Sequence, residues 1–455
     1  EMEGAKTLLF EEGSVKDKDI ELYEILKDEE KRQLEGINLI ASENYTSQTV
    51  LEVLGTPLQN KYAEGYPGAR YYRGTEFCDK IELLAQKRAL EAFHLDNEKW
   101  GVNVQPLSGS PANFEVYSAL IGKDAKIMGL NLQDGGHLSH GFENRGKKVS
   151  ATSYYFESKP YFICSETGLI NYDKLEVDAE EFKPNMIIVG YSAYSRDLDY
   201  KRFREICDKV GALMLVDMAH YCGLVAAKVL SDPFEYADVV TTTTHKILRG
   251  PRGGMIFSKK EFEEKINFSV FPHHQGGPHM NNIAALCYAL KDVASDKYTE
   301  YAEQVVKNAK TMAEAMIAKG YEIMTGGTDN HIILWNVTKC GLTGGKVEAV
   351  LEKLLIYTNK NSIAGDKSPM NPGGVRLGTP AVTTRGMLEE EMKAIVDSLE
   401  KAITLSQNIQ KKSGKKLTDF LAALDSEDFK EEIEIYREEV RKLSLRFDVP
   451  KSPIE

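Results

Sequence analysis

The sequence predicts an α/β protein whose main domain is a mostly parallel β-sheet with helices on both faces. Two observations lead to this class. Short apolar runs alternate with helical patterns between about residues 60 and 280, and after about Asp292 the chain changes to long helical stretches around a single strand. Alternation of the first kind is typical of βαβ units, and the later change indicates a second, smaller α/β domain.

An N-terminal helical arm is expected before the main domain. Apolar residues recur at helical spacing among charges from 20 to 34, which is the pattern of an amphipathic helix. We assign residues 1–58 to this arm.

The main domain is assigned to residues 59–292. The runs 186–189 and 212–216, and Val239-Val240 followed by four threonines, are apolar or β-branched throughout, as expected of strands buried on both faces. A charged helix is predicted between the first two runs, from 200 to 210.

Residues 293–455 are predicted to form the smaller domain. A helix is expected from 298 to 319, a strand from 331 to 337 and a helix from 345 to 355. A loop rich in Gly and Pro follows, and long charged helices end the chain.

Composition excludes several classes of function. The formal charge is −12, from 57 Lys and Arg against 69 Asp and Glu, so a broad surface for nucleic acid is not expected. Six scattered cysteines without a CxxC pair indicate free thiols in a reducing compartment, and neither a disulfide framework nor a metal site. No apolar run approaches the ~18 residues of a membrane span, and the first residues do not resemble a signal peptide. We expect a cytoplasmic protein, with a mitochondrial or plastid form after leader removal as the alternative.

The most specific local signal is a buried β-branched strand followed by a lysine. Four threonines, 241 to 244, precede His245 and Lys246, and the segment 249–254 that follows is rich in Gly and Pro. Sheets of this class bind ligands at the carboxyl ends of their strands, and the glycines indicate that the backbone approaches something closely. Taken alone, a solvated lysine at a strand end is the simpler interpretation.

Asp217 ends the preceding predicted strand. A carboxylate in that position is costly unless it meets a cation. The protonated ring nitrogen of pyridoxal phosphate is such a cation, and it needs an acidic partner for the ring to accept electrons. An N-cap for the following helix is the alternative. Because Asp217 and Lys246 follow strands in adjacent βα units, a shared cofactor is favoured.

Four further motifs suit a site for a small charged molecule. Ser108-Gly109-Ser110 before a helix can cradle an anion, and His137 on a glycine turn can lie flat on an aromatic ring. Several tyrosines accompany Glu64 in a Gly/Pro loop, which suits recognition or acid–base chemistry. Arg376 can hold a carboxylate through two parallel hydrogen bonds. The alternatives are an ordinary capped turn, a structural histidine and a structural ion pair.

Taken together, these motifs closely resemble those of the serine hydroxymethyltransferase family. The similarity runs from Leu39-Ile40-Ala41-Ser42-Glu43-Asn44 to beyond Arg385, and it includes the strings 61–68, 241–246 and 275–279. The resemblance implies a fold-type I pyridoxal-phosphate-dependent transferase. Such an enzyme interconverts L-serine plus tetrahydrofolate with glycine plus 5,10-methylenetetrahydrofolate.

The resemblance also implies roles at the cofactor. Lys246 would be the Schiff-base lysine, Asp217 the partner of the pyridine nitrogen and His137 the residue stacked on the ring. Thr243 would assist the exchange of Lys246 for the substrate amine. The other cofactor contacts within the chain would be Ser108, Gly109, Ser110, Ser192, His220, His245 and Arg252. The substrate carboxylate would be bound by Ser42 and Arg376.

Family members are at least dimers, so a homodimer or a tetramer with shared sites is implied. Glu64 would handle a proton at the serine hydroxyl and at folate. The residues that reach in from the neighbouring subunit would be Tyr62, Glu64, Tyr72, Gly276 and Gly277. The folate site would be lined by Leu132, Gly136, Leu138, Asn361, Ser368, Pro369 and Met370.

The chain departs from the family pattern at a few positions. Arg73 stands where Gly usually follows the paired tyrosines, Ala364 stands at a usual Pro, and two histidines precede Gln275. Arg73 and Ala364 lie in or beside the implied folate-facing loops, so they bear on folate affinity. Ile247 and Asn330-His331 are more similar to protist members, especially apicomplexan ones, than to animal members.

Two other classes remain open on the sequence. A related fold-type I aldolase or acyltransferase acting on glycine would share Lys246 and Asp217 but lack the loop around Glu64. A scaffold or an RNA-binding regulator would predict loss of Lys246 or a basic stripe, and the sequence has Lys246 and no such stripe. An absorbance spectrum separates enzyme from binding module, because the covalently held cofactor is yellow.

Overall fold

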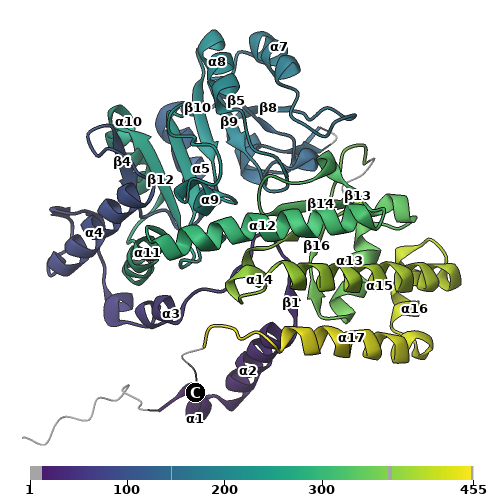
Figure 1. The fold of residues 1–455 in the computed structure, drawn as a ribbon. Coiled ribbons are helices and arrows are strands. Elements are labelled where there is room, and N and C mark those ends of the chain that lie inside the picture. The colour runs from purple at the N-terminus through teal and green to yellow at the C-terminus, as the bar shows by residue number, and fades with distance from the viewer. Residues whose placement is uncertain (1–12, 145, 367–370, 452–453, 455) are drawn as a thin grey trace, which may run out of the picture.

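A computed structural model describes residues 13–144, 146–366, 371–451 and 454. A seven-stranded sheet forms the centre of its larger part (Figure 1). In spatial order the strands are β4 (Trp100–Asn103), β12 (Gly254–Lys259), β11 (Val239–Thr243), β10 (Leu213–Asp217), β9 (Met186–Gly190), β5 (Lys126–Leu130) and β8 (Glu157–Tyr161). Within this sheet β12 alone runs antiparallel to its neighbours, so the predicted mixed α/β class with a mostly parallel sheet is confirmed.

The central strands are buried on both faces, as their continuous apolar sequence predicts. Successive side chains of β9 point to opposite faces, so Met186 and Ile188 join one hydrophobic core while Ile187 and Val189 join another. The bounds of these predicted strands agree with the observed bounds to within one or two residues. The helix between β9 and β10 is α8 (Tyr200–Val210), as expected.

Helices cover both faces of this sheet (Figure 1). They are α4 (Glu76–Ala92), α5 (Gly109–Leu120), α6 (Ala151–Tyr155), α7 (Tyr172–Phe182), α8, α9 (Cys222–Ala226), α10 (Lys260–Phe268) and α11 (Met280–Val293). Two short hairpins, β2 (Gly65–Tyr66) with β3 (Ala69–Arg70) and β6 (Glu143–Asn144) with β7 (Lys147–Lys148), project from it.

The smaller part of the fold has a hydrophobic core of its own, called the second core below, which is built on a four-stranded antiparallel sheet. Its order is β13 (Glu322–Ile323), β14 (Ile332–Asn336), β17 (Gly374–Gly378), β16 (Asn359–Asn361). The long helix α12 (Asp296–Ala318) lies between this part and the larger one (Figure 1). The remaining helices are α13 (Gly344–Lys353), α14 (Pro380–Thr384), α15 (Glu389–Ser413), α16 (Leu417–Leu424) and α17 (Lys430–Ser444).

The N-terminal segment contacts both parts. After α1 (Val15–Lys18) and α2 (Ile20–Glu35), β1 (Ile37–Asn38) pairs with β15 (Ile356–Tyr357), and Ile37 and Leu39 join the second core. The next helix, α3 (Gln48–Leu54), packs against α11 instead. By contrast, α2 buries none of its residues, and its Ile20 and Ile25 are exposed.

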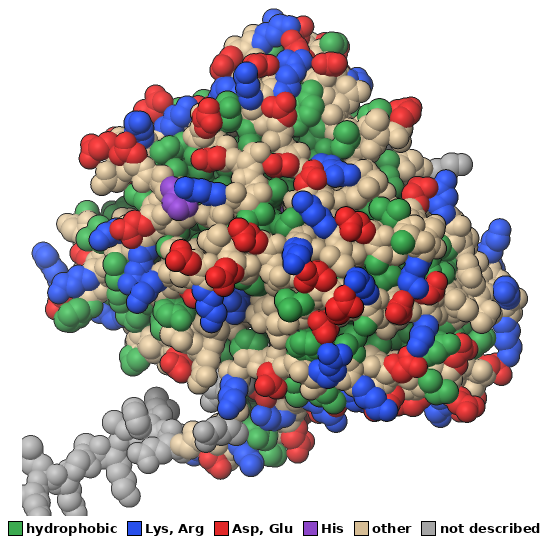
Figure 2. All heavy atoms as spheres, in the orientation of Figure 1, with side chains coloured by type: hydrophobic (Ala, Val, Ile, Leu, Met, Phe, Trp, Pro, Cys, Tyr) green, Lys and Arg blue, Asp and Glu red, His purple; other side chains and the backbone are tan. Residues whose placement is uncertain are grey.

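The surface mixes both signs of charge. Figure 2 shows acidic and basic side chains interspersed over one face, without a basic stripe on that face. Among the described helices, none combines the length and the apolar character that a membrane crossing requires.

Candidate active site

A cavity of about 180 Å³ lies at the carboxyl ends of β9, β10 and β11. This is the edge where a parallel sheet of this kind binds its ligand. Ten of the predicted site residues line the cavity, from five separate segments of the chain. They are Ser108, Gly109, Ser110, His137, Ser192, Asp217, His220, Thr243, His245 and Lys246, with Tyr191 and Ala219 as additional lining residues.

Asp217 is the buried anion of the cavity. Its Oδ2 accepts hydrogen bonds from Asn113 Nδ2 and His140 Nε2, both at 2.8 Å, and its Oδ1 accepts from the Ala219 N–H at 3.1 Å. Burial alone raises the pKa of this carboxyl, but the hydrogen bonds from His140 and Asn113 and the electrostatic effect of the neighbouring histidines outweigh it and hold the pKa below its usual value. The group is therefore ready to pair with a cationic ring nitrogen.

His137 is held in one orientation beside Asp217. Its Nδ1 lies 2.7 Å from Ser139 Oγ and 3.2 Å from the Ser139 backbone nitrogen. Burial lowers the pKa of His137 to about 4, so the imidazole is neutral at physiological pH. A neutral, fixed ring suits stacking on an aromatic cofactor.

Lys246 follows the end of β11 by three residues and lines the cavity. In the described part of the chain its Nζ has no hydrogen-bond partner. Burial lowers the pKa of this amine, although the Asp217 carboxylate opposes the change. A larger neutral fraction makes the amine a better nucleophile toward a carbonyl group.

The first turn of α5 provides the anion cradle. Ser108 is its N-cap residue, and its extended backbone leaves the following N–H groups pointing out of the helix end. A Cβ atom at Gly109 would lie 2.7 Å from Thr243 Cγ2, so only glycine lets α5 approach β11 this closely. The cradle and Lys246 consequently line one cavity.

These residues fit pyridoxal phosphate. The cavity combines an anion cradle, a carboxylate for the ring nitrogen, a flat neutral imidazole and a lysine amine. Two buried ring nitrogens at its wall, His220 Nδ1 and His245 Nδ1, have no partner within the described residues. Such orphaned atoms indicate a polar group that is satisfied by a bound molecule or by water.

Arg376, on β17, is a buried residue whose guanidinium hydrogen-bonds only to uncharged groups among the described residues. Its Nε donates to Asn359 Oδ1 at 2.9 Å, its Nη1 donates to Ser192 O at 2.7 Å, and its Nη2 lies 3.5 Å from Ser42 Oγ. Burial lowers its pKa to about 10. Within the described residues Arg376 forms no ion pair, which argues against the structural ion pair and favours a ligand carboxylate.

A second cluster gathers other predicted residues away from that cavity. The rings of Tyr62 and Tyr72 lie 5.0 Å apart. A Cβ at Gly276 would lie 3.1 Å from Glu64 Oε1, and one at Gly277 would lie 3.2 Å from the Tyr62 ring. None of these five residues lines the cavity beside Lys246. The single chain therefore assembles the predicted residues at two separate places.

Arg70 fixes the backbone on both sides of Glu64. Its Nη1 donates to Ala63 O at 2.8 Å and to Gly65 O at 2.9 Å, while Nη2 pairs with the fully buried Glu82 at 2.6 Å. Asp79 accepts from Nε at 2.8 Å. Our sequence reasoning did not single out this buried network, because its members lie in two segments, residues 63–70 and 79–82.

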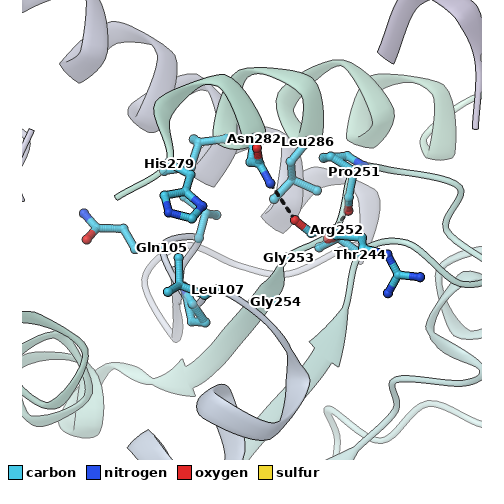
Figure 3. Close-up of a pocket in the computed structure, with 13 residues that line it drawn as sticks. Gln105, Leu107, Thr244, Pro251, Arg252, Gly253, Gly254, His279, Asn282 and Leu286 are labelled. Atoms are coloured by element: carbon cyan, nitrogen blue, oxygen red, sulfur yellow. Dashed lines mark hydrogen bonds between the residues drawn. The ribbon is translucent and has the colours of Figure 1, made fainter. Parts of the chain in front are cut away.

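Arg252 lies in a neighbouring recess rather than in the main cavity. This recess of about 20 Å³ is lined by Asn282 and Leu286 of α11 and by His279, the N-cap residue of that helix (Figure 3). Asn282 Nδ2 donates to Arg252 O at 2.8 Å, and Thr244 Oγ1 donates to Pro251 O at 2.6 Å. These bonds fix the glycine-rich loop that follows Lys246.

The predicted folate residues are placed in part. Leu132 begins a short 3₁₀ turn, Leu138 is half-exposed, and Asn361 ends β16. Gly136 has no room for a side chain, because a Cβ there would lie 1.9 Å from Leu130 O. The predictions for Ser368, Pro369 and Met370 lie outside the described residues.

The sequence analysis missed Asn113, Ser139, His140 and Asn359, which hold the functional side chains in place. Asn113 lies three residues beyond the predicted cradle, and that proximity was the signal available. Across the described residues, no group of three or more His, Cys, Asp or Glu side chains is arranged to hold a metal ion.

Comparison with known proteins identifies one family. The family model described as "Serine hydroxymethyltransferase" matches residues 15–399. A Caenorhabditis elegans protein named serine hydroxymethyltransferase is 51% identical over 447 residues, covering 95% of this chain and 88% of that protein. Serine hydroxymethyltransferase 4 of Arabidopsis thaliana is 51% identical and covers 95% and 94%. A cytosolic serine hydroxymethyltransferase of Saccharomyces cerevisiae is 53% identical and covers 90% and 91%.

Proposed function

Because the chain belongs to the serine hydroxymethyltransferase family, we propose that the cavity beside Lys246 is its active site and assign roles to the surrounding residues. The enzyme interconverts L-serine and tetrahydrofolate with glycine and 5,10-methylenetetrahydrofolate, using pyridoxal phosphate. The observation that carries the assignment is the convergence of Lys246, Asp217, His137 and the α5 cradle on one cavity.

Each end of the cofactor has a residue to hold it. The phosphate would be bound by the first N–H groups of α5 at Ser108, Gly109 and Ser110, where the helix dipole favours an anion. His137 would cover the ring, and Lys246 Nζ would hold the cofactor covalently. When bound, the cofactor supplies an electron sink for the bonds at the substrate Cα.

Asp217 and Lys246 prepare the site electrostatically. The hydrogen bonds at Asp217 keep its carboxylate charged, so Asp217 would hold a proton on the ring nitrogen of the bound cofactor. Burial keeps part of the Lys246 amine neutral. Thr243, whose hydroxyl donates to Ala219 O at 3.2 Å, stands next to the position where the substrate amine would replace that of Lys246.

Arg376 is assigned to the substrate carboxylate. Asn359 and Ser192 O occupy hydrogens on Nε and Nη1, while Nη2 has only a long contact to Ser42. A carboxylate would thus bind at the Nη1 and Nη2 edge, through two parallel hydrogen bonds.

Glu64 is assigned to proton transfer at the substrate hydroxyl, in the active site of the partner subunit. Support comes from the cluster of Tyr62, Glu64, Tyr72, Gly276 and Gly277, which the fold keeps away from its own chain's cavity. The tyrosines are exposed, Tyr62 by 55% and Tyr72 by 46%, as expected of a surface that a second copy covers. The enzyme works as an oligomer, as its family does.

Domain limits and location complete the proposal. We divide the chain into an arm (1–58), a large cofactor-binding domain (59–292) and a small domain (293–455). Separate hydrophobic cores on the seven-stranded and four-stranded sheets support a division near α12, a helix that contributes residues to both. A cytoplasmic location is favoured over an organelle by three fungal relatives whose names include "cytosolic".

The absorbance spectrum of a Lys246→Ala variant tests the active-site assignment. The purified wild-type protein should absorb visible light as the yellow, covalently held cofactor does, and the variant should not. Thermal unfolding should be little changed, since the Lys246 amine makes no hydrogen bond within the described residues and its removal relieves the burial of an ionisable group. Lys99→Ala, at an exposed lysine, is the control. Wild-type turnover of serine by Lys246→Ala would disprove the role of Lys246.

A further inference from the structure

Asn113 occupies the centre of the hydrogen-bond network behind the cavity. It is 1% exposed and uses every polar hydrogen and its oxygen. Nδ2 donates to Asp217 Oδ2 at 2.8 Å and to Ser139 Oγ at 2.9 Å, and Oδ1 accepts from Thr241 Oγ1 at 2.6 Å. The amide orientation is determined by chemistry, because a flipped amide would place its oxygen against the Asp217 carboxylate.

The first hydrogen bond of the Asn113 amide stabilises the negative charge of Asp217. A donor to a buried carboxylate stabilises the charged form and disfavours protonation. Asn113 and His140 both donate to the same oxygen, while the Ala219 N–H satisfies the other one. Asn113 differs from His140 in carrying no proton that can dissociate, so its contribution does not change with pH.

The second hydrogen bond of the Asn113 amide affects, through Ser139, which ring nitrogen of His137 carries the proton. Because Asn113 donates to Ser139 Oγ, the hydroxyl proton of Ser139 is free to point at His137 Nδ1, 2.7 Å away. The Ser139 N–H also points at Nδ1, so that nitrogen is an acceptor. With its pKa lowered to about 4 the ring is neutral, and its single proton resides on Nε2.

We propose that Asn113 is a positioning residue that fixes both the ionised state of Asp217 and the Nε2-protonated tautomer of His137. The assignment rests on the proposed function and deepens it. Through one amide, the helix that cradles the phosphate also sets the two groups that hold the ring. Thr241 on β11 donates to the oxygen of this amide from the opposite side.

The other charged and titratable groups that act on Asp217 come from several elements. They are His137 and His140 after β5, Lys246 after β11, Tyr117 on α5 and Tyr221 after β10. These groups remain when Asn113 is replaced. Loss of its amide therefore removes one fixed donor, and the Asp217 carboxyl becomes easier to protonate.

Binding of pyridoxal phosphate to the full-length apoprotein tests the proposal. Affinity is measured by quenching of tryptophan fluorescence between about pH 5 and 8. Asn113→Leu, which is similar in size but cannot hydrogen-bond, should bind the cofactor about 10- to 100-fold more weakly. The acidic pH at which binding fails should rise, because Asp217 must be ionised to hold the ring nitrogen.

Two variants separate positioning from simple loss of packing. Thr241→Val removes a hydrogen bond from the same buried cluster but leaves both donations from Asn113, so the acid limit of binding should stay in place. Ser139→Ala removes the hydroxyl that links Asn113 to His137. It should weaken cofactor binding without changing the acidic pH at which binding fails. If Asn113→Leu does not fold, Asn113→Ala, which adds no volume, replaces it.

The outcomes are distinct. A rise in the acid limit for the Asn113 variant but not for Thr241→Val supports the proposal. An unchanged affinity and acid limit in the Asn113 variant overturns it, and so does an equal rise in Thr241→Val. If the wild-type protein itself fails to bind pyridoxal phosphate, the proposed function fails first.

Discussion

At the residue scale, Arg376 has the least ordinary environment of the site. A buried guanidinium normally meets a carboxylate, since an unpaired buried charge is strongly unfavourable. Arg376 meets an amide oxygen, a carbonyl oxygen and a hydroxyl instead. This environment supports the proposed role of Arg376 in binding a substrate carboxylate.

Replacement of Arg376 by Ala should weaken serine and glycine binding by about one to two orders of magnitude, the value of a charge-assisted pair of hydrogen bonds. The cofactor spectrum should remain, and titration of its absorbance with glycine measures the affinity. Arg376→Lys is the matched control, because it keeps a charge but loses the planar fork. Substrate-free thermal stability should fall by less than the loss of a buried ion pair would cause, because Arg376 bonds only to uncharged groups. Unchanged amino-acid affinity would make Arg376 a purely structural residue.

At the element scale, α5 contains a buried acidic side chain in addition to the N-terminal turn proposed to bind the phosphate. Glu115, in its middle, is fully buried, and neither carboxylate oxygen has a hydrogen-bond partner in the described structure. Burial raises its pKa to about 8. The helix therefore holds a neutral acid at physiological pH, one and a half turns from the N-terminus that would bind the phosphate.

This environment predicts a stability that depends on pH. The folded pKa of Glu115 is raised above its unfolded value, so its contribution is fully present below about pH 4.5 and is lost as pH rises through about 8. Glu115→Gln cannot ionise, and its free energy of unfolding should exceed that of the wild type at pH 9 by a few kcal/mol.

Thermal unfolding of both proteins between about pH 5 and 9 measures this difference. The subtraction of variant from wild type isolates Glu115 from other groups that titrate in the same range. Glu98→Gln, at an exposed position, serves as the control and should show no such trend. Parallel curves for Glu115→Gln and wild type would mean that Glu115 is charged or solvated in solution.

At the scale of the whole molecule, one chain holds two clusters of proposed site residues that do not meet. Lys246, Asp217 and His137 share a cavity, whereas Tyr62 and Glu64 belong to a separate exposed cluster. In a closed dimer with twofold symmetry, each cluster can complete the cavity of the other chain.

Mixed dimers test this arrangement. A Lys246→Ala chain exchanged with a Glu64→Gln chain should form heterodimers in which one site carries both lesions and the other carries neither. About half of a random mixture is heterodimer, so roughly a quarter of all sites should be active. Activity assays after subunit exchange measure the recovery.

A matched pair controls for nonspecific rescue. Lys246→Ala mixed with Asp217→Asn places both lesions in the cavity of their own chains, so every site keeps one lesion and the mixture should stay inactive. If the Lys246→Ala and Glu64→Gln mixture is equally inactive despite proven exchange, Glu64 acts within its own chain.

The sequence by itself determined the elements that local physics dictates. Strands β9, β10 and β11 and helix α8 were predictable because a strand buried on both faces must be apolar throughout, whereas a covering helix repeats every 3.6 residues. The meeting of Lys246 and Asp217 at one cavity was predictable for a related reason. The carboxyl ends of adjacent parallel strands share one edge of the sheet.

Only the tertiary structure decided which side chains hydrogen-bond to Asp217 and Arg376, and which proposed site residues lie outside the cavity. Asn113 lies 104 residues from Asp217 in the sequence, and Arg376 lies 184 residues from Ser192. The pairing of β1 with β15 likewise joins the N-terminal segment to the smaller part of the fold within one core. Such contacts depend on the packing of whole elements against one another. A local pattern records only whether a residue is apolar, polar or conformationally special, so it cannot specify the partner.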